Sequence, residues 1–136
     1  MPELMLHHVS IIVRDLDISL PFYRDVFGLT PITRPPFPFP GAWLGCGALQ
    51  IHLIVYPGGS FRTSNKIDRN DLHFAFRTDD FDGIVGRLQS MGFDVDAAEG
   101  DPKKIFLNRQ ALAGFPQLYL LDPDRNIIEI NGAPMA

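Results

Sequence analysis

Apolar and polar residues alternate over His8–Val13, which is the spacing of a strand whose two faces differ. One face is wholly apolar and consists of Val9, Ile11 and Val13. His8 opens the opposite, more polar face. By the same alternation, His7 is expected on the apolar side that faces the helix.

A helix is predicted to follow this strand, because Asp15 and Asp17 offer N-cap oxygens and Gly28 offers a left-handed C-terminal stop. The helix is expected to run to about Phe27. Pro21 is expected in its first turn, where backbone N–H groups have no intrahelical partner.

A fainter copy of the same pattern begins at His73, with Asp80 and Asp82 as caps and Gly92 as the stop. A strand is predicted at 72–78 and a helix from about 81 to 91. The chain therefore reads as one small module used twice.

Further strands complete each copy. In the first, 29–34 predicts a strand, and 43–55 predicts two strands broken near Gly45–Gly47. The proline-rich segment 35–41 cannot form a regular ladder and is expected to be a surface loop or pocket rim. In the second copy, strands are predicted at 93–97, within 99–116, at 117–121 and at 127–131, with a turn at 122–126.

These elements predict an α+β fold of two βαβββ modules, with helices outside a curved, antiparallel-rich sheet. We expect a single domain over residues 1–136, made of module one (5–56), a linker (57–70) and module two (71–132).

Strand alternation places four polar residues on the inner sheet face: His8, His52, His73 and Glu129. Glu129 lies between Ile128 and Ile130, where a carboxylate is expensive to bury without a partner. A single inward histidine is more often a hydrogen-bonded core residue. Here, however, the repeat makes the four positions equivalent in pairs.

Three imidazoles and one carboxylate suit a divalent transition metal such as Zn, Ni, Co, Mn or Fe. An octahedral ion held by all four would keep two neighbouring positions for a substrate with two adjacent oxygens. It would act as a Lewis acid that polarises a carbonyl.

The segments HVSIIVRDLDISLPFYRDVFGL, LHFAFRTDD and DPDRNIIEI resemble the vicinal oxygen chelate superfamily of glyoxalases, bleomycin resistance proteins and extradiol dioxygenases. The resemblance implies paired βαβββ modules and a homodimer whose metal site can draw ligands from both subunits. His8, His73 and Glu129 match the recurrent His, His and Glu ligands. His52 matches a fourth position that is glutamate in typical glyoxalase I.

Three functions follow from these residues. The leading one is a metal-dependent lyase or isomerase resembling glyoxalase I, in which His52 or Glu129 moves a proton. The first alternative is a metal-free protein that binds a small molecule, like antibiotic-sequestering members of the superfamily. The second is a single-unit extradiol-type dioxygenase with Fe(II) on His8, His73 and Glu129.

Five residues are candidates for contacting the substrate: Arg34, Trp43, Gln50, Arg109 and Tyr119. The two arginines would neutralise a carboxylate or phosphate. In the alternative interpretation both arginines are solvated and the two aromatic residues belong to the core. In the final turn, Arg125 occupies the place of the glycine in the superfamily's usual DPDGN, and its charge is expected to point to solvent.

Composition narrows the partners and the location. The net charge of −4, without a basic block, argues against nucleic acid. No apolar run approaches the roughly 18 residues of a membrane span. Cys46 is the only cysteine, and the first residues carry Glu3 and two histidines rather than the pattern of a signal peptide. We therefore expect a cytoplasmic protein that acts on a small molecule.

Overall fold

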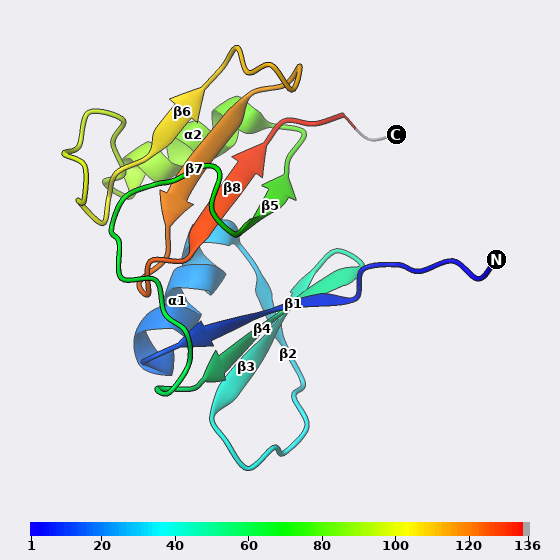
Figure 1. Cartoon of the computed structure of the whole chain (residues 1–136). Coiled ribbons are helices and arrows are strands. Elements are labelled where there is room, and N and C mark those ends of the chain that lie inside the picture. The colour runs from blue at the N-terminus through cyan, green and yellow to red at the C-terminus, as the bar shows by residue number, and fades with distance from the viewer. Residues whose placement is uncertain (135–136) are drawn as a thin grey trace. The chain divides into compact units, whose positions relative to one another are not determined.

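A computed structural model describes residues 1–134 and divides the chain into two compact units, Met1–Phe61 and a second that begins at Arg62. Figure 1 shows their elements. Neither unit, over the described residues, contains a helix long and apolar enough to cross a membrane.

Unit one is a four-stranded sheet with one helix. Its elements are β1 (His8–Val13), α1 (Leu16–Phe27), β2 (Thr30–Ile32), β3 (Gly41–Cys46) and β4 (Leu49–Val55). The strand order is β1-β4-β3-β2, with β1 parallel to β4 and the other pairs antiparallel. Pro31 is tolerated because β2 lies at the sheet edge.

Unit two repeats this plan. Its elements are β5 (His73–Arg77), α2 (Phe81–Ser90), β6 (Phe106–Asn108), β7 (Gln117–Leu121) and β8 (Ile127–Asn131). The order β5-β8-β7-β6 matches that of unit one position by position, again with one parallel pair. The predicted α+β fold of two βαβββ modules is confirmed.

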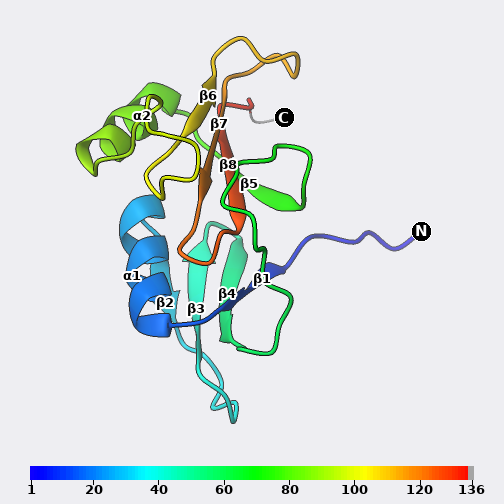
Figure 2. The same cartoon turned by 60° about the vertical axis from the view of Figure 1, so that its left-hand side comes forward.

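Helix α1 packs against β3 and β4 of its own sheet. Figure 2 shows α1 to the left of these strands. The Asp15 side chain accepts from the N–H of Asp17 at 2.9 Å, and Gly28 ends the helix with φ 68°. Pro21 is the sixth helical residue, so its expected place in the first turn is wrong. It leaves the Asp17 carbonyl without the usual i+4 donor, and the helix tolerates that loss.

The final turn fixes β8 against β7. Asp122 is buried, and its Oδ1 accepts from the backbone N–H groups of Asp124 and Asn126 at 2.9 and 2.7 Å. Arg125 follows with φ 69°, which explains why a glycine suits this position. Its side chain is exposed, as expected.

The predicted strand at 93–97 is wrong. Only an isolated bridge joins Asp94 to Lys104, and the chain turns where the strand was expected. Asp94 Oδ1 accepts from the N–H of Asp96, and such local bonds compete with a sheet ladder. The module's second strand is β6, within the 99–116 segment.

Candidate functional site

Three rings form a stack on the polar face of the unit-one sheet. His52 of β4 lies opposite Trp43 of β3, and their rings stack with centroids 4.0 Å apart and planes 2° apart. His8 of β1 stacks with His52, also at 4.0 Å, at an interplanar angle of 17°. The imidazole of His52 is buried in this stack, whereas that of His8 is exposed.

His7 joins this cluster, against expectation. Its Nδ1 lies 2.8 Å from Nδ1 of His8, and its ring centroid lies 6.4 Å from that of His52. Strand β1 begins only at His8, so the alternation that assigned His7 to the helix side does not apply.

A cavity of about 310 Å³ opens beside the stack, lined by His7, His8, Arg34, Phe37, Phe39, Trp43, His52 and Ile54. The proline-rich loop supplies its rim through Phe37 and Phe39. Gln50 is absent from the lining, but its Oε1 accepts from Nε2 of His52 at 2.8 Å and orients that ring.

Burial lowers the pKa of His52, and the charges of His8, His7 and Arg34 lower it further. A histidine with a lowered pKa stays neutral at physiological pH, so one ring nitrogen keeps a lone pair. Since Nε2 donates to Gln50, that nitrogen is Nδ1.

Unit two places His73 and Glu129 together on the corresponding face of its sheet. Nδ1 of His73 donates to the Asp71 carbonyl at 2.8 Å, and Nε2 lies 3.4 Å from Oε1 of Glu129. Glu129 is buried, and its Oε2 accepts from Nδ2 of Asn131 at 2.6 Å. Asn131 was not predicted as a site residue, although the alternation in β8 already places it on the face of Glu129.

Tyr119 provides a second hydrogen bond to the Glu129 carboxylate. Burial and this carboxylate raise the pKa of Tyr119 to about 12, so its hydroxyl stays protonated at any physiological pH. Its ring centroid lies 5.7 Å from that of His73. Tyr119 is therefore a buried residue that also touches the polar pair.

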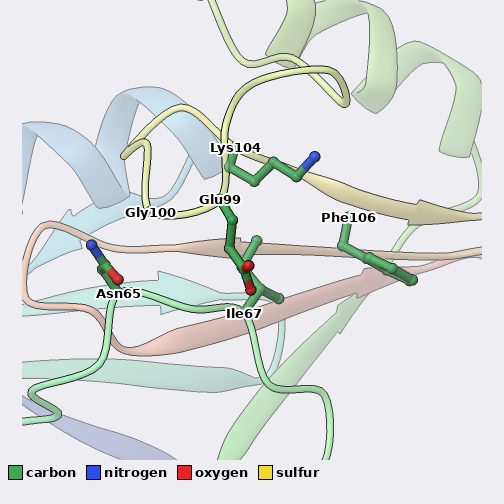
Figure 3. Close-up of a pocket in the computed structure, with 6 residues that line it drawn as sticks. All are labelled: Asn65, Ile67, Glu99, Gly100, Lys104 and Phe106. Carbon is green, nitrogen blue, oxygen red and sulfur yellow. The ribbon is translucent and has the colours of Figure 1, made fainter.

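A second cavity has a volume of about 260 Å³. Figure 3 shows the residues that line it: Asn65, Ile67, Glu99, Gly100, Lys104 and Phe106. Phe106 and Ile67 pack against the cluster that contains Tyr119. Arg109 is placed elsewhere: it is exposed and pairs with Asp82 of α2. The structure thus gives Arg109 a surface ion pair instead of a place beside His73 and Glu129.

The four predicted ligands therefore form two pairs, one in each unit. Residues 1–134 contain no group of three or more His, Cys, Asp or Glu residues arranged to hold a metal ion. Two atoms that each lie about 2.1 Å from one ion are about 3.0 Å apart at an octahedral angle and about 3.4 Å apart at a tetrahedral one. The distance of 3.4 Å between Nε2 of His73 and Oε1 of Glu129 fits this range.

The unit-one pair does not fit as it stands. An imidazole binds a metal in the plane of its ring, so stacked rings cannot both ligate one ion until one of them turns. Of the two rings, that of His8 is the exposed one.

Two βαβββ modules with a histidine on the first strand of each are typical of one protein class. The model of the Glyoxalase/Bleomycin resistance protein/Dioxygenase superfamily matches residues 5–130, and the chain belongs to this superfamily.

Two curated relatives and one solved structure illustrate the similarity. The chain is 33% identical to Glyoxylase I 4 of Arabidopsis thaliana over 127 residues, which cover 92% of this chain and 68% of that protein. It is 27% identical to the glutathione transferase FosA of Serratia marcescens over 131 residues, 96% of this chain and 82% of that one. A lactoylglutathione lyase from Agrobacterium tumefaciens has the same fold, with a TM-score of 0.68, 23% identity and coverage of 98% and 96%.

Proposed function

We propose that the protein is a metal-dependent lyase or isomerase resembling glyoxalase I, acting on a small substrate with two adjacent oxygens. The observation that carries the proposal is the His73–Glu129 pair. Membership of the superfamily and the similarity to Glyoxylase I 4 support the reaction class.

The hydrogen bonds around this pair argue for a cation. Because Nδ1 of His73 donates to a backbone carbonyl, the neutral ring has a bare lone pair on Nε2. With that lone pair free, Nε2 of His73 and Oε1 of Glu129, 3.4 Å apart, can both bind one metal ion, in the position that a proton on Nε2 would otherwise occupy. Metal-ligating histidines usually donate their other N–H in this way.

We expect His73 and Glu129 to hold the ion and His8 and His52 to be its further ligands. The donor set suits Zn, Ni, Co, Mn or Fe. When bound, such an ion supplies Lewis-acid polarisation of a substrate carbonyl.

The proton is moved by this chain's own residues. The neutral ring of His52 has its lone pair on Nδ1, since Gln50 holds Nε2, so His52 would act as a base when Nδ1 is not bound to the ion. Glu129 is the second candidate base, and Tyr119 and Asn131 fix its carboxylate. Trp43 and Arg34 line the cavity in which the substrate would lie.

The same proposal includes a single domain with a linker at 57–70, a cytoplasmic location and a homodimer with shared metal ligands. The resemblance to the superfamily supports the homodimer. Sedimentation equilibrium would contradict it by giving the mass of one chain.

Turnover of a small dicarbonyl–thiol adduct by the untagged protein, with each of the five metals added in turn, tests the proposal. We expect one or two metals to support turnover and His73→Ala to abolish it. Glu129→Gln should also lose turnover, whereas the matched control Glu3→Gln, at an exposed site, should keep it. Retained turnover in His73→Ala would exclude the assignment.

The second candidate is a metal-free protein that binds a small molecule, and the stacked rings of His8, His52 and Trp43 favour it. In that arrangement the rings form a cavity wall and need no ion. This function predicts tight ligand binding that a chelator leaves unchanged.

A further inference from the structure

Arg34 is a half-buried cation with no carboxylate beside it. The lining of its cavity contains no Asp or Glu, and over the described residues Arg34 forms no ion pair. Its one hydrogen bond runs from Nη2 to the Phe39 carbonyl at 2.8 Å. Most of its five N–H donors therefore remain available to an anion.

The guanidinium is held in a defined place. Its Cζ lies 5.0 Å from the ring centroids of both Phe37 and Phe39. A Cβ added at Gly41 would lie 3.1 Å from Nε and Nη2 of Arg34, so the side chain runs closely across this glycine. A cation fixed in this way loses little freedom when it binds a ligand.

Aromatic rings surround the same space. The rings of Phe37 and Phe39 stack at 5.5 Å, and Phe37 lies 6.1 Å from Trp43, between ring centroids. Phe37 and Phe39 are 42% and 41% exposed, which is a large apolar area to leave in water. A planar apolar ligand would cover it.

From this juxtaposition we infer that the cavity of unit one binds a small aromatic carboxylate, with its carboxylate on Arg34 and its ring on Phe37, Phe39 and Trp43. The planar guanidinium matches a carboxylate through two parallel hydrogen bonds. A cavity of about 310 Å³ has room for a one-ring ligand. The inference rests on the proposed function and names its substrate class. The substrate would be an aromatic acid with a second oxygen on the carbon next to its carboxylate.

Trp43 is the only tryptophan, so its fluorescence reports directly on this cavity. The protein as purified is titrated with benzoate, with benzamide as the uncharged analogue and acetate as the acid without a ring. We expect saturable quenching by benzoate and binding of benzamide that is roughly 10- to 100-fold weaker. Acetate should be weaker still.

Arg34→Gln should weaken benzoate binding by roughly 10- to 100-fold and leave benzamide binding unchanged. Arg24→Gln, which removes an exposed helix arginine of the same unit, is the matched control and should bind benzoate normally. Arg34→Lys keeps the charge and the aliphatic stem and should give an intermediate affinity. It serves as the test if the glutamine variant does not fold.

Equal affinity for benzoate and benzamide, or benzoate binding unchanged in both Arg34 variants, would overturn the inference. A metal-loaded, active enzyme that ignores benzoate would refute the substrate class and leave the proposed function intact. Arg34-dependent benzoate binding in a protein that never takes up metal would support the binding site and refute the proposed metal-dependent function.

Discussion

Replacing Asn131 with aspartate tests the environment of Glu129 at constant side-chain size. Nδ2 of Asn131 donates to Oε2 of Glu129 at 2.6 Å, and both residues are buried. Oδ1 of Asn131 accepts from the N–H of Ala133 at 3.1 Å, and an aspartate keeps that bond. The substitution therefore exchanges one buried donor for a second carboxylate.

The structure sets the size of the effect. Losing a hydrogen bond to a charged group costs about 1.5–3 kcal/mol. Two carboxylates this close do not both stay ionised, and keeping a carboxyl of ordinary pKa protonated at pH 7 costs up to about 4 kcal/mol. The shared proton restores part of the lost bond, so we expect Asn131→Asp to lower the free energy of unfolding by about 2–4 kcal/mol at pH 7.

The penalty should shrink as the pH falls. The folded variant binds one more proton than its unfolded chain at pH 7, so acid favours the folded state of the variant relative to wild type. Urea unfolding of both proteins from about pH 8 to about pH 5 measures this difference.

Asn108→Asp is the control, because Asn108 uses only its Oδ1, which accepts from the N–H of Gln110. Its effect should be small and nearly independent of pH. If Asn131→Asp unfolds within about 0.5 kcal/mol of wild type at pH 7, the described hydrogen bond between Asn131 and Glu129 is refuted.

Three further predictions concern single residues. Arg125→Asn should stabilise the protein by up to about 1 kcal/mol in thermal unfolding, because asparagine tolerates φ 69° better than arginine; a lower melting temperature would contradict the strain. The Tyr119 phenol should ionise with a pKa of about 12 in an ultraviolet titration, and Glu129→Gln should lower that pKa towards 10; an unchanged pKa would remove the carboxylate as a cause. Since the pKa of His52 is lowered by burial, the unfolded state takes up its proton first, so stability should fall as the pH drops below about 6.5. In His52→Gln the loss of stability at acid pH should be smaller than in the wild type. An identical dependence of stability on pH in the two proteins would argue against a lowered pKa of His52.

Much of the fold was predictable because strand side chains alternate between two faces. This periodicity predicted that His8, His52, His73 and Glu129 lie on the more polar sides of strands. In the structure all four lie within paired strands. The aspartate caps and Gly28 likewise define α1 and α2 locally, without help from distant residues.

Other features depend on contacts that no local pattern contains. His7 lies outside β1, so alternation misplaces it, and its position beside His8 comes from a side-chain contact. The sequence alone does not distinguish Arg34 from Arg109 as an anion contact, and the ion pair of Arg109 with Asp82 depends on residues far apart in the chain. The ring stack of His8, His52 and Trp43 depends on three strands in register.

Elemental analysis by mass spectrometry of the untagged protein tests the central claim most directly. We expect about one divalent transition-metal ion per chain after reconstitution with Zn, Ni, Co, Mn or Fe, and none in His73→Ala or Glu129→Ala. Glu3→Gln should retain the metal of the wild type. A wild type that stays metal-free under all five conditions would contradict the claim and favour the metal-free binding protein.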